Sequence, residues 1–421
     1  MLKQWSGLKI GMNGWIKMQL TEQHIIHDDR FREWCVKAKN LYNQSLYYWR
    51  QSLFGNIERF TEYELSGLYT KFNEETYRAL PIHTSQQIIK FLFSNIKGWD
   101  MALKEYLKEP YKFSGKPGLP KYKKELSELY FTNKQVKLKN GFVCFPKILG
   151  VVPIKTNITN INHCRVIPKA NHFVVEFVYT IEEKPVKEYD GNWMGVDVGL
   201  NNLTTCVTKD QAFIINGKPL KAINNYYNKR KRVLQSKLKQ KVYTSKRIER
   251  LTFRRTQKTK DYLHKASRLI VDKAKELGVT KIIIGKNENW KQNINLGKKT
   301  NREFVSIPHA TLIEKIKYKA LLDGIETLIT QEAYTSKCSA LDLEEIRKHE
   351  TYVGKRKKRG LFVTADGSLV NADANGALNI ARLGLSVSGD EITISESVRS
   401  AVVAPNKMDV LHDKTKSIKS F

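Results

Sequence analysis

The sequence predicts a multidomain protein of mixed α+β and α/β structure, and three observations lead to this fold class. The chain has 421 residues, which is too long for one ordinary hydrophobic core. Apolar side chains recur at helical spacing through residues 28–107, whereas residues 130–182 alternate between apolar and polar side chains as strands do. Residues 193–203 and 279–285 have the apolar character of buried strands, and a helical stretch separates them, as in an α/β sheet.

The charge of the chain indicates the kind of partner. There are 73 lysines and arginines against 42 acidic residues, which gives a formal net charge of +31. A surplus of this size favours nucleic acid as the partner over an anionic membrane. No apolar run approaches the roughly 20 residues that a membrane span requires. We therefore expect a soluble cytoplasmic protein without a membrane partner, associated with the nucleoid when it is bound to DNA.

One acidic residue, Asp197, interrupts the apolar run at residues 193–203. An unpaired charge inside a buried strand is costly, so something must compensate it. A divalent cation is one solution, because Mg²⁺ prefers hard oxygen ligands and often completes its coordination with phosphate oxygens. A buried aspartate that caps a turn is the alternative, and this stretch alone does not decide between them. The neighbouring Gly195 and Gly199 are expected to leave room for a nucleic-acid backbone.

A second acidic stretch lies near the other end of the chain, at residues 366–381. Its pattern predicts a turn that leads into a helix, with Asp373 in the first turn. Small residues there would let the helix pack closely on a sheet, and the positive end of the helix favours a carboxylate. Two acids from distant parts of the chain could therefore flank one metal site.

The combined motifs resemble a known family. The Asp197 strand, the Asp373 helix start, the run Tyr334-Thr335-Ser336 and the basic helices between them are similar to TnpB, the RNA-guided nuclease of bacterial insertion sequences. They are also similar to the compact type V CRISPR effectors. The resemblance covers roughly residues 100–385 and implies a RuvC-type RNase H-like core, a guide RNA and double-stranded DNA as target.

The resemblance also implies how the chain is divided into domains. An N-terminal helical recognition lobe and a small β-barrel, the wedge domain, would precede the nuclease core. The expected segments are 1–27, the first wedge strands; 28–110, the helical lobe; 111–190, the β-barrel; 191–332, the core with a basic helical hairpin at 222–278; 333–370, an insertion that binds the target nucleic acid; 371–385, the last core helix; and 386–421, a C-terminal tail that could be disordered.

The resemblance places a third acid at a position where this sequence has none. The family normally ends the strand at residues 279–285 with a glutamate, and here Gly285 stands in its place. Glu332 ends the next predicted strand, and the carboxyl ends of neighbouring parallel strands lie only about 4.8 Å apart. We therefore favour Glu332. Glu288, in the loop after Gly285, is the reserve candidate, and loss of the third acid is the remaining alternative.

Basic segments indicate where nucleic acid would bind. Residues 115–124 form a proline-rich basic loop, and residues 229–260 hold lysine or arginine at 14 of 32 positions. Another basic run lies at residues 348–359. The predicted nucleic-acid-binding residues are Lys116, Lys121, Tyr122, Lys123, Lys124, Arg230, Lys231, Arg232, Arg247, Arg254, Arg255, Ser336, Lys355 and Arg356.

The cysteines predict that there is no structural zinc. The resembled family usually carries a four-cysteine zinc ribbon between the Tyr-Thr-Ser run and the last acid, whereas only Cys338 is present in that segment here. A single cysteine cannot hold tetrahedral zinc. The five cysteines of the chain are scattered, which is typical of reduced thiols in a cytosolic protein.

The sequence therefore predicts an RNA-guided DNA endonuclease. Asp197, Glu332 and Asp373 would hold two Mg²⁺ ions, and the displaced DNA strand would enter their cleft. The expected partners are a guide RNA and double-stranded target DNA, and we expect a monomer more than a dimer. Two alternatives stay open: a nuclease-dead RNA-guided repressor, which Gly285 favours, and a transposase of the RNase H class that acts without RNA.

Overall fold

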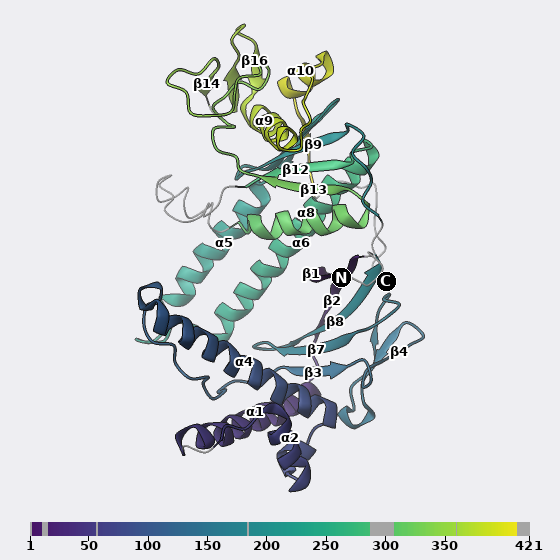
Figure 1. The fold of residues 1–421 in the computed structure, drawn as a ribbon, viewed down its shortest axis with the longest axis vertical. Helices are drawn as coiled ribbons and strands as arrows, with labels where there is room; N and C mark the ends of the chain where they lie inside the picture. The colour runs from purple at the N-terminus through teal and green to yellow at the C-terminus, as the bar shows by residue number, and fades with distance from the viewer. Residues whose placement is uncertain are drawn as a thin grey trace. The chain divides into compact units, whose positions relative to one another are not determined.

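The computed structural model describes residues 2–10, 16–55, 58–182, 185–286, 307–358 and 360–410. The chain is a mixed α+β protein and divides into two compact units. Unit 1 comprises residues 1–10 and 17–181, and unit 2 comprises residues 11–16 and 182–421. Figure 1 shows the elements of both units.

Helices form residues 30–108 of unit 1, as the apolar spacing predicts. Helices α1 and α4 pack against each other through buried side chains that include Leu41, Leu46, Ile89 and Leu92. A capping box begins α2. The Thr61 hydroxyl accepts a hydrogen bond from the Glu64 backbone amide, and the Glu64 carboxylate accepts one from the Thr61 backbone amide. The helices are α1 (Arg30–Phe54), α2 (Glu62–Lys71), α3 (Glu75–Arg78) and α4 (Ile82–Lys108), followed by the short η1 (Pro110–Lys112).

Strands form the rest of unit 1, in two sheets. Five strands lie in the order β1-β2-β8-β7-β3, and β4, β5 and β6 make a separate three-stranded sheet. The predicted strands are present, but a closed barrel stays a prediction, because β1 and β3 are the two ends of the described order. The bounds are β1 (Leu2–Ile10), β2 (Ile16–Ile26), β3 (Leu129–Thr132), β4 (Lys137–Lys139), β5 (Phe142–Cys144), η2 (Lys147–Leu149), β6 (Ile154–Lys155), β7 (His163–Pro168) and β8 (Phe173–Glu182).

Unit 2 is built on a six-stranded sheet in the order β13-β12-β9-β10-β11-β17. Strands β9, β10 and β11 form an antiparallel meander, and β12 runs parallel to both β9 and β13. The carboxyl ends of β9, β12 and β13 therefore meet at one edge of the sheet, which agrees with the premise that the last two strands are parallel neighbours. The bounds are β9 (Trp193–Val198), β10 (Asn202–Thr208), β11 (Ala212–Asn216), β12 (Lys281–Gly285), β13 (Glu326–Thr330) and β17 (Asn406–Met408).

Helices cover both faces of this sheet (Figure 1). Met194, Val196 and Ile284 belong to a core shared with α6 and α8, whereas Trp193 and Ile283 belong to a core shared with α9 and α10. Because strand side chains alternate, Asp197 lies on the same face of β9 as Trp193, the face that α9 covers. The helices are α5 (Lys218–Gln235), α6 (Lys246–Glu276), α8 (His309–Leu322), α9 (Ala372–Val387) and α10 (Glu396–Val403).

Gly195 has a different role from the one that the sequence suggested. A Cβ atom at this position would collide with the backbone of Ala377 and lie 2.8 Å from the Cβ atom of Ala381, both in α9. Gly199 belongs to the turn after β9, where a Cβ atom would lie 2.6 Å from the Asn202 carbonyl oxygen. Gly195 therefore allows close helix packing, and the expectation that it makes room for a nucleic-acid backbone is wrong. Gly199 allows a tight turn and lines the pocket beside Asp197, so its expected role stays a prediction.

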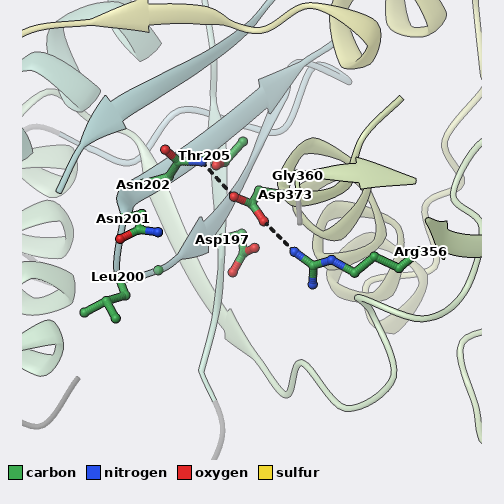
Figure 2. Close-up of a pocket in the computed structure, with 9 residues that line it drawn as sticks. Asp197, Leu200, Asn201, Asn202, Thr205, Arg356, Gly360 and Asp373 are labelled. Carbon is green, nitrogen blue, oxygen red and sulfur yellow. Dashed lines mark hydrogen bonds and ion pairs between the residues drawn. The ribbon is translucent and has the colours of Figure 1, made fainter. Parts of the chain in front are cut away.

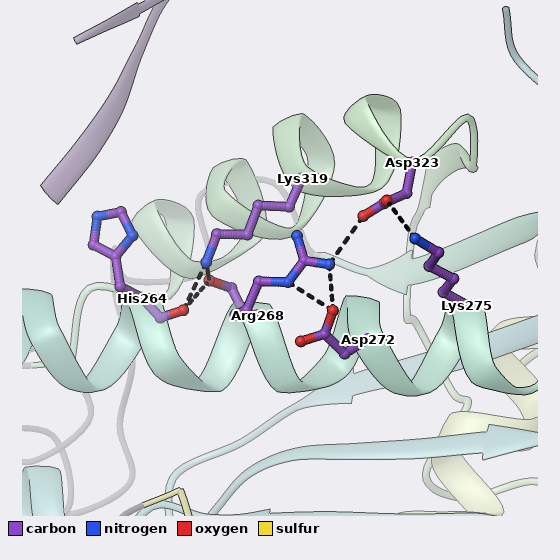
Figure 3. A network of polar contacts seen from close by, with 7 residues as sticks. His264, Arg268, Asp272, Lys275, Lys319 and Asp323 are labelled. Atoms are coloured by element: carbon purple, nitrogen blue, oxygen red, sulfur yellow. Dashed lines mark hydrogen bonds and ion pairs between the residues drawn. The ribbon is translucent and has the colours of Figure 1, made fainter. Parts of the chain in front are cut away.

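A polar network fixes α8 on α6 (Figure 3). The Lys319 ammonium donates to the His264 carbonyl oxygen at 2.6 Å and to the Ser267 hydroxyl at 2.8 Å. Arg268 pairs with Asp323, at the end of α8, at 3.0 Å. Burial lowers the pKa of Lys319 to about 7. Since α8 leads directly into β13, this network helps to set where β13 begins.

The C-terminal segment differs from the expected tail. Strand β17 pairs in parallel with β11, and α10 buries Val398 and Val402 in the core that α9 shares. Disorder is therefore wrong for residues 386–410, and residues 411–421 lie outside the described part of the chain. Between β13 and α9 the chain forms a small antiparallel sheet of β14 (Lys355–Lys358), β15 (Leu361–Val363) and β16 (Leu369–Asn371).

Candidate active site

Asp197 is the penultimate residue of β9, and its half-buried side chain faces α9. Gly376 of α9 leaves space for it, because a Cβ atom on Gly376 would lie 3.2 Å from Asp197 Oδ2. Burial raises the pKa of the Asp197 carboxyl to about 8, and the carboxylates of Glu332 and Asp373 add to this rise. Arg356 opposes it. Glu332 and Asp373 are therefore both close enough to Asp197 to disfavour its charge.

Asp373 lies in the first turn of α9, where the helix dipole favours negative charge. The Asn371 side chain caps the helix by accepting from the Asp373 and Ala374 amides at 3.0 and 3.1 Å. The Asp373 carboxylate accepts a 2.7 Å hydrogen bond from the Asn202 amide group and pairs with Arg356 at 3.4 Å (Figure 2). These two interactions hold the carboxylate over the end of β9.

Glu332 follows β13 by two residues and reaches back to the end of β12. A Cβ atom on Gly285 would lie 2.8 Å from Glu332 Oε2, so the glutamate carboxylate occupies the space into which a side chain at position 285 would project. Burial raises the pKa of Glu332 to about 7. The structure thus brings Glu332 together with Asp197, whereas the reserve candidate Glu288 lies outside the described residues.

A pocket of about 270 Å³ opens beside these acids (Figure 2). Asp197 and Asp373 are its acidic side chains, and Arg356 of β14 is its basic one. Glu332 approaches Asp197 from the β12 side and is not one of the residues that line the pocket. The residues that line the pocket are Asp197, Gly199, Leu200, Asn201, Asn202, Thr205, Arg356, Gly360 and Asp373.

This donor set fits divalent metal ions that prefer oxygen ligands. Three carboxylates converge where burial already makes two of them costly to ionise, and a bound cation would remove that cost. Sequence reasoning missed the role of Asn202, which orients Asp373. The only feature of the sequence that could have indicated this role is the position of Asn202, shortly after the strand that carries Asp197.

The basic loop at residues 115–124 follows the prediction only in part. Lys116, Lys121, Tyr122 and Lys124 are exposed. Lys123 instead turns inward: its ammonium donates to the Ser127 hydroxyl at 2.7 Å and lies 4.3 Å from the centre of the Tyr42 ring. Burial lowers its pKa. Lys123 therefore fixes the loop onto the helices, which contradicts its placement on a phosphate track.

The other predicted nucleic-acid residues lie mostly on the surface. On the α5–α6 hairpin, Lys231 and Arg255 are half-buried, and Arg255 donates to the Asn224 side chain at 2.8 Å. The remaining predicted hairpin residues are exposed, as are those near the pocket, where Arg356 also pairs with Asp373. The exposed set is Arg230, Arg232, Arg247, Arg254, Ser336, Lys355 and Arg356.

Comparison with known proteins identifies the relatives of this chain. A family model described as "Probable transposase" matches residues 176–291, and one described as "Cas12f1-like, TNB domain" matches residues 309–380. The first range contains Asp197, and the second contains Glu332 and Asp373. The chain is a TnpB-like relative of the compact type V effectors. The resemblance seen in the sequence is thereby confirmed.

Two curated proteins are similar to this TnpB-like chain. The CRISPR-associated endodeoxyribonuclease Cas12f2 of a Micrarchaeota archaeon is 25% identical over 285 residues, which cover 63% of this chain and 50% of that protein. A TnpB-like protein of Methanocaldococcus jannaschii is 25% identical over 179 residues, which cover 41% of this chain and 63% of that protein. The chain thus matches between half and two thirds of the length of each relative.

Solved structures are similar to the TnpB-like chain at low identity. A Cas12f1-sgRNA-target DNA complex matches with 18% identity and a TM-score of 0.49, covering 84% of this chain and 82% of that one. A mini-RNA-guided endonuclease, CRISPR-Cas_phi3, matches with 10% identity and a TM-score of 0.46, covering 87% and 92%. Among the described residues of this chain, no helix is long and apolar enough to cross a membrane.

Proposed function

We propose that this chain is an RNA-guided DNA endonuclease and that its six-stranded sheet is a RuvC-type RNase H-like core. The observation that carries the proposal is the convergence of Asp197, Glu332 and Asp373, which come from three separate elements. The names of the similar proteins, an endodeoxyribonuclease and a TnpB-like protein, support the same reaction.

The three carboxylates act as metal ligands in this proposal. Two Mg²⁺ ions bound there would supply a hydroxide nucleophile and stabilise the leaving oxygen of the cleaved phosphodiester. Asn202 keeps the Asp373 carboxylate in place through its hydrogen bond. Arg356, which pairs with the Asp373 carboxylate at 3.4 Å, would contact a DNA phosphate when metal ions bind that carboxylate.

The proposed partners are a guide RNA and double-stranded DNA, bound by one copy of the chain. The net charge of +31 and the exposed arginines of the α5–α6 hairpin support a polyanionic partner. Pairing between guide and target would select the DNA, and the displaced strand would enter the acidic pocket.

The nuclease-dead alternative depended on the missing glutamate at position 285. That argument loses its force, because the Glu332 carboxylate lies where a side chain from this position would begin. The transposase alternative keeps one supporting observation, the description of the first family model. Sequencing RNA that copurifies with the protein separates the transposase from the RNA-guided nuclease, since a transposase of this class acts without a defined RNA.

Glu332→Gln tests the proposal most directly. We expect Mg²⁺-dependent cleavage of a guide-matched plasmid to fall at least about 100-fold, because loss of even an outer-shell partner of a metal typically costs 10–100-fold. Glu326→Gln is the matched control, because Glu326 is an exposed glutamate at the other end of β13. Equal cleavage by Glu332→Gln and the unaltered protein would remove Glu332 from the site.

A further inference from the structure

Three side chains with metal-binding chemistry meet in the segment between β13 and β14. The Cys338 sulfur, a Glu344 carboxylate oxygen and a His349 ring nitrogen all lie within 4.8 Å of one another. Cys338 and Glu344 are buried, and His349 is half-buried. None of the three lines the acidic pocket, so the cluster is separate from the candidate active site.

Hydrogen bonds hold all three groups, and the Cys338 thiol itself donates to the Arg347 carbonyl oxygen at 3.6 Å, a contact that a metal ion would replace. His349 Nε2 lies 2.7 Å from the Glu345 carbonyl oxygen, which can only accept, so in the neutral ring Nε2 carries the hydrogen and Nδ1 the lone pair. A metal-binding histidine usually donates its second N–H to a carbonyl or carboxylate in this way. The Glu344 oxygens accept from the Ser339 and Val353 amides at 2.6 and 2.9 Å. Each oxygen keeps a second lone pair.

Cys338 is fixed in place by α9. Its carbonyl oxygen accepts hydrogen bonds from the Asn375 and Asn379 side chains at 2.9 and 2.8 Å, and Asn375 also accepts from the Ala340 amide. One ligand of the cluster is therefore held on the helix that carries Asp373. His349, in contrast, lies in a loop and is the residue that can adjust.

We propose that Cys338, Glu344 and His349 bind one zinc ion. A thiolate, a carboxylate and a neutral imidazole together carry two negative charges, which balance Zn²⁺ in a largely buried site. The mixed sulfur, nitrogen and oxygen donors suit zinc and not Mg²⁺ or Ca²⁺. A water molecule would complete the tetrahedron.

The geometry requires only a small closure. Zinc bonds of about 2.3 Å to sulfur and 2.0 Å to nitrogen place neighbouring ligand atoms roughly 3.5 Å apart. The ligand atoms now lie within 4.8 Å of one another, so the longest of these distances would shorten by about 1 Å on binding. This proposal replaces the expectation of no zinc, which counted cysteines and did not anticipate a histidine and a glutamate from the following loop.

The ion would tie the loop at residues 344–353 to α9. This loop leads directly into β14, whose Arg356 borders the acidic pocket. Zinc would therefore help to hold the basic strand beside the site, without taking part in the reaction.

Metal analysis of the full-length protein tests the site. After purification and dialysis against excess Mg²⁺, we expect about one zinc per chain by mass spectrometry, and an approximately tenfold or greater loss in Cys338→Ser and in His349→Ala. Cys144→Ser and His83→Ala, which change the same residue types elsewhere, should keep the zinc. Asp197→Asn should also keep the zinc. Zinc bound in the acidic pocket instead would be lost in this variant, so the variant distinguishes the two places.

Cobalt substitution gives a second readout that does not depend on metal content alone. Co²⁺ bound to the protein should show thiolate charge-transfer absorption, and Cys338→Ser should abolish it. Less than about one tenth of a zinc per chain, retention of zinc by His349→Ala, or its loss in Asp197→Asn would each overturn the proposal. If Cys338→Ser fails to fold, His349→Ala decides, because its side chain lies in a partly exposed loop.

Discussion

At the residue scale, the pKa of Asp197 connects metal binding to stability. The pKa of this carboxyl is near 3.8 in the unfolded chain and about 8 in the fold, because burial and the carboxylates of Glu332 and Asp373 disfavour its charge. Its ionisation therefore destabilises the fold progressively as the pH rises from about 4 to about 8. Glu332, with a pKa of about 7, acts in the same direction.

Mg²⁺ should therefore stabilise the protein more at pH 8 than at pH 5.5. We expect the rise in melting temperature on adding Mg²⁺ to be larger at the higher pH, and to be much smaller in Asp197→Asn at both. Buried cations such as Lys319 make the fold more stable as the pH rises, which is the opposite trend. The Mg²⁺-induced shift is therefore compared between Asp197→Asn and the unaltered protein at each pH. A Mg²⁺-induced shift of the same size in Asp197→Asn would contradict the assignment.

Asn202 should act as a positioning residue for Asp373. Without its 2.7 Å hydrogen bond the carboxylate keeps only the longer ion pair with Arg356, so Asn202→Ala should lower metal affinity about 10–100-fold. Cleavage should recover as the Mg²⁺ concentration is raised, while RNA binding is unchanged. Asn225→Ala, on the exposed side of α5, serves as the control. An unaltered Mg²⁺ requirement would show that Asn202 has no such role.

At the element scale, the parallel pairing of β12 and β13 lets a glutamate beyond one strand replace a side chain on the other. Gly285 lies opposite Thr330, two residues before Glu332. The sequence could predict that these ends adjoin only on the premise that the two strands are parallel neighbours, because β12 is apolar whereas β13 contains Glu326, Thr327 and Thr330. It could not show that the carboxylate fills the space beside Gly285, because that depends on how the chain turns after Thr330.

Placing a glutamate at position 285 should test whether Glu332 takes the role of a side chain from the end of β12. Gly285→Glu alone should reduce cleavage, because the new side chain would crowd Glu332 Oε2 and add a like charge. Gly285→Glu combined with Glu332→Ala should restore part of the activity that Glu332→Ala removes, since the flexible tip of Ile380 is the other group that must move. Rates would come from plasmid cleavage. A double variant no more active than Glu332→Ala would argue against a shared metal position.

At the scale of the whole molecule, the charge surplus should appear as salt-dependent RNA binding. Arg247 and Arg254 lie exposed on α6 and form no ion pair with an acidic side chain of the described residues, whereas Lys265 and Lys275 on the same helix pair with Asp261 and Asp323. Replacing the two arginines by alanine should weaken binding. It should also reduce the slope of log affinity against log salt by about 0.7 for each phosphate that the protein no longer neutralises.

The double variant Lys265→Ala/Lys275→Ala is the charge-matched control and should change the slope less. Filter binding of the copurified RNA at several salt concentrations measures both. Equal slopes in the two double variants would mean that the hairpin arginines bind no particular phosphate and contribute only to the overall charge.

The sequence by itself determined the features that depend on local pattern and composition. The helical lobe, the strands of both units, the choice of Asp197 and Asp373 as candidate site acids and the proposal of a polyanionic partner all follow from periodicity, charge and short motifs, which neighbouring residues establish among themselves. The family resemblance followed from the same motifs.

Only the tertiary structure decided where distant side chains meet. It placed Glu332 beside Gly285, turned Lys123 into the helical lobe, paired β17 with β11 and brought His349 and Glu344 to Cys338. Each of these interactions joins segments whose positions are set by packing against other elements, and side-chain direction there depends on strand register and helix approach that no local pattern encodes.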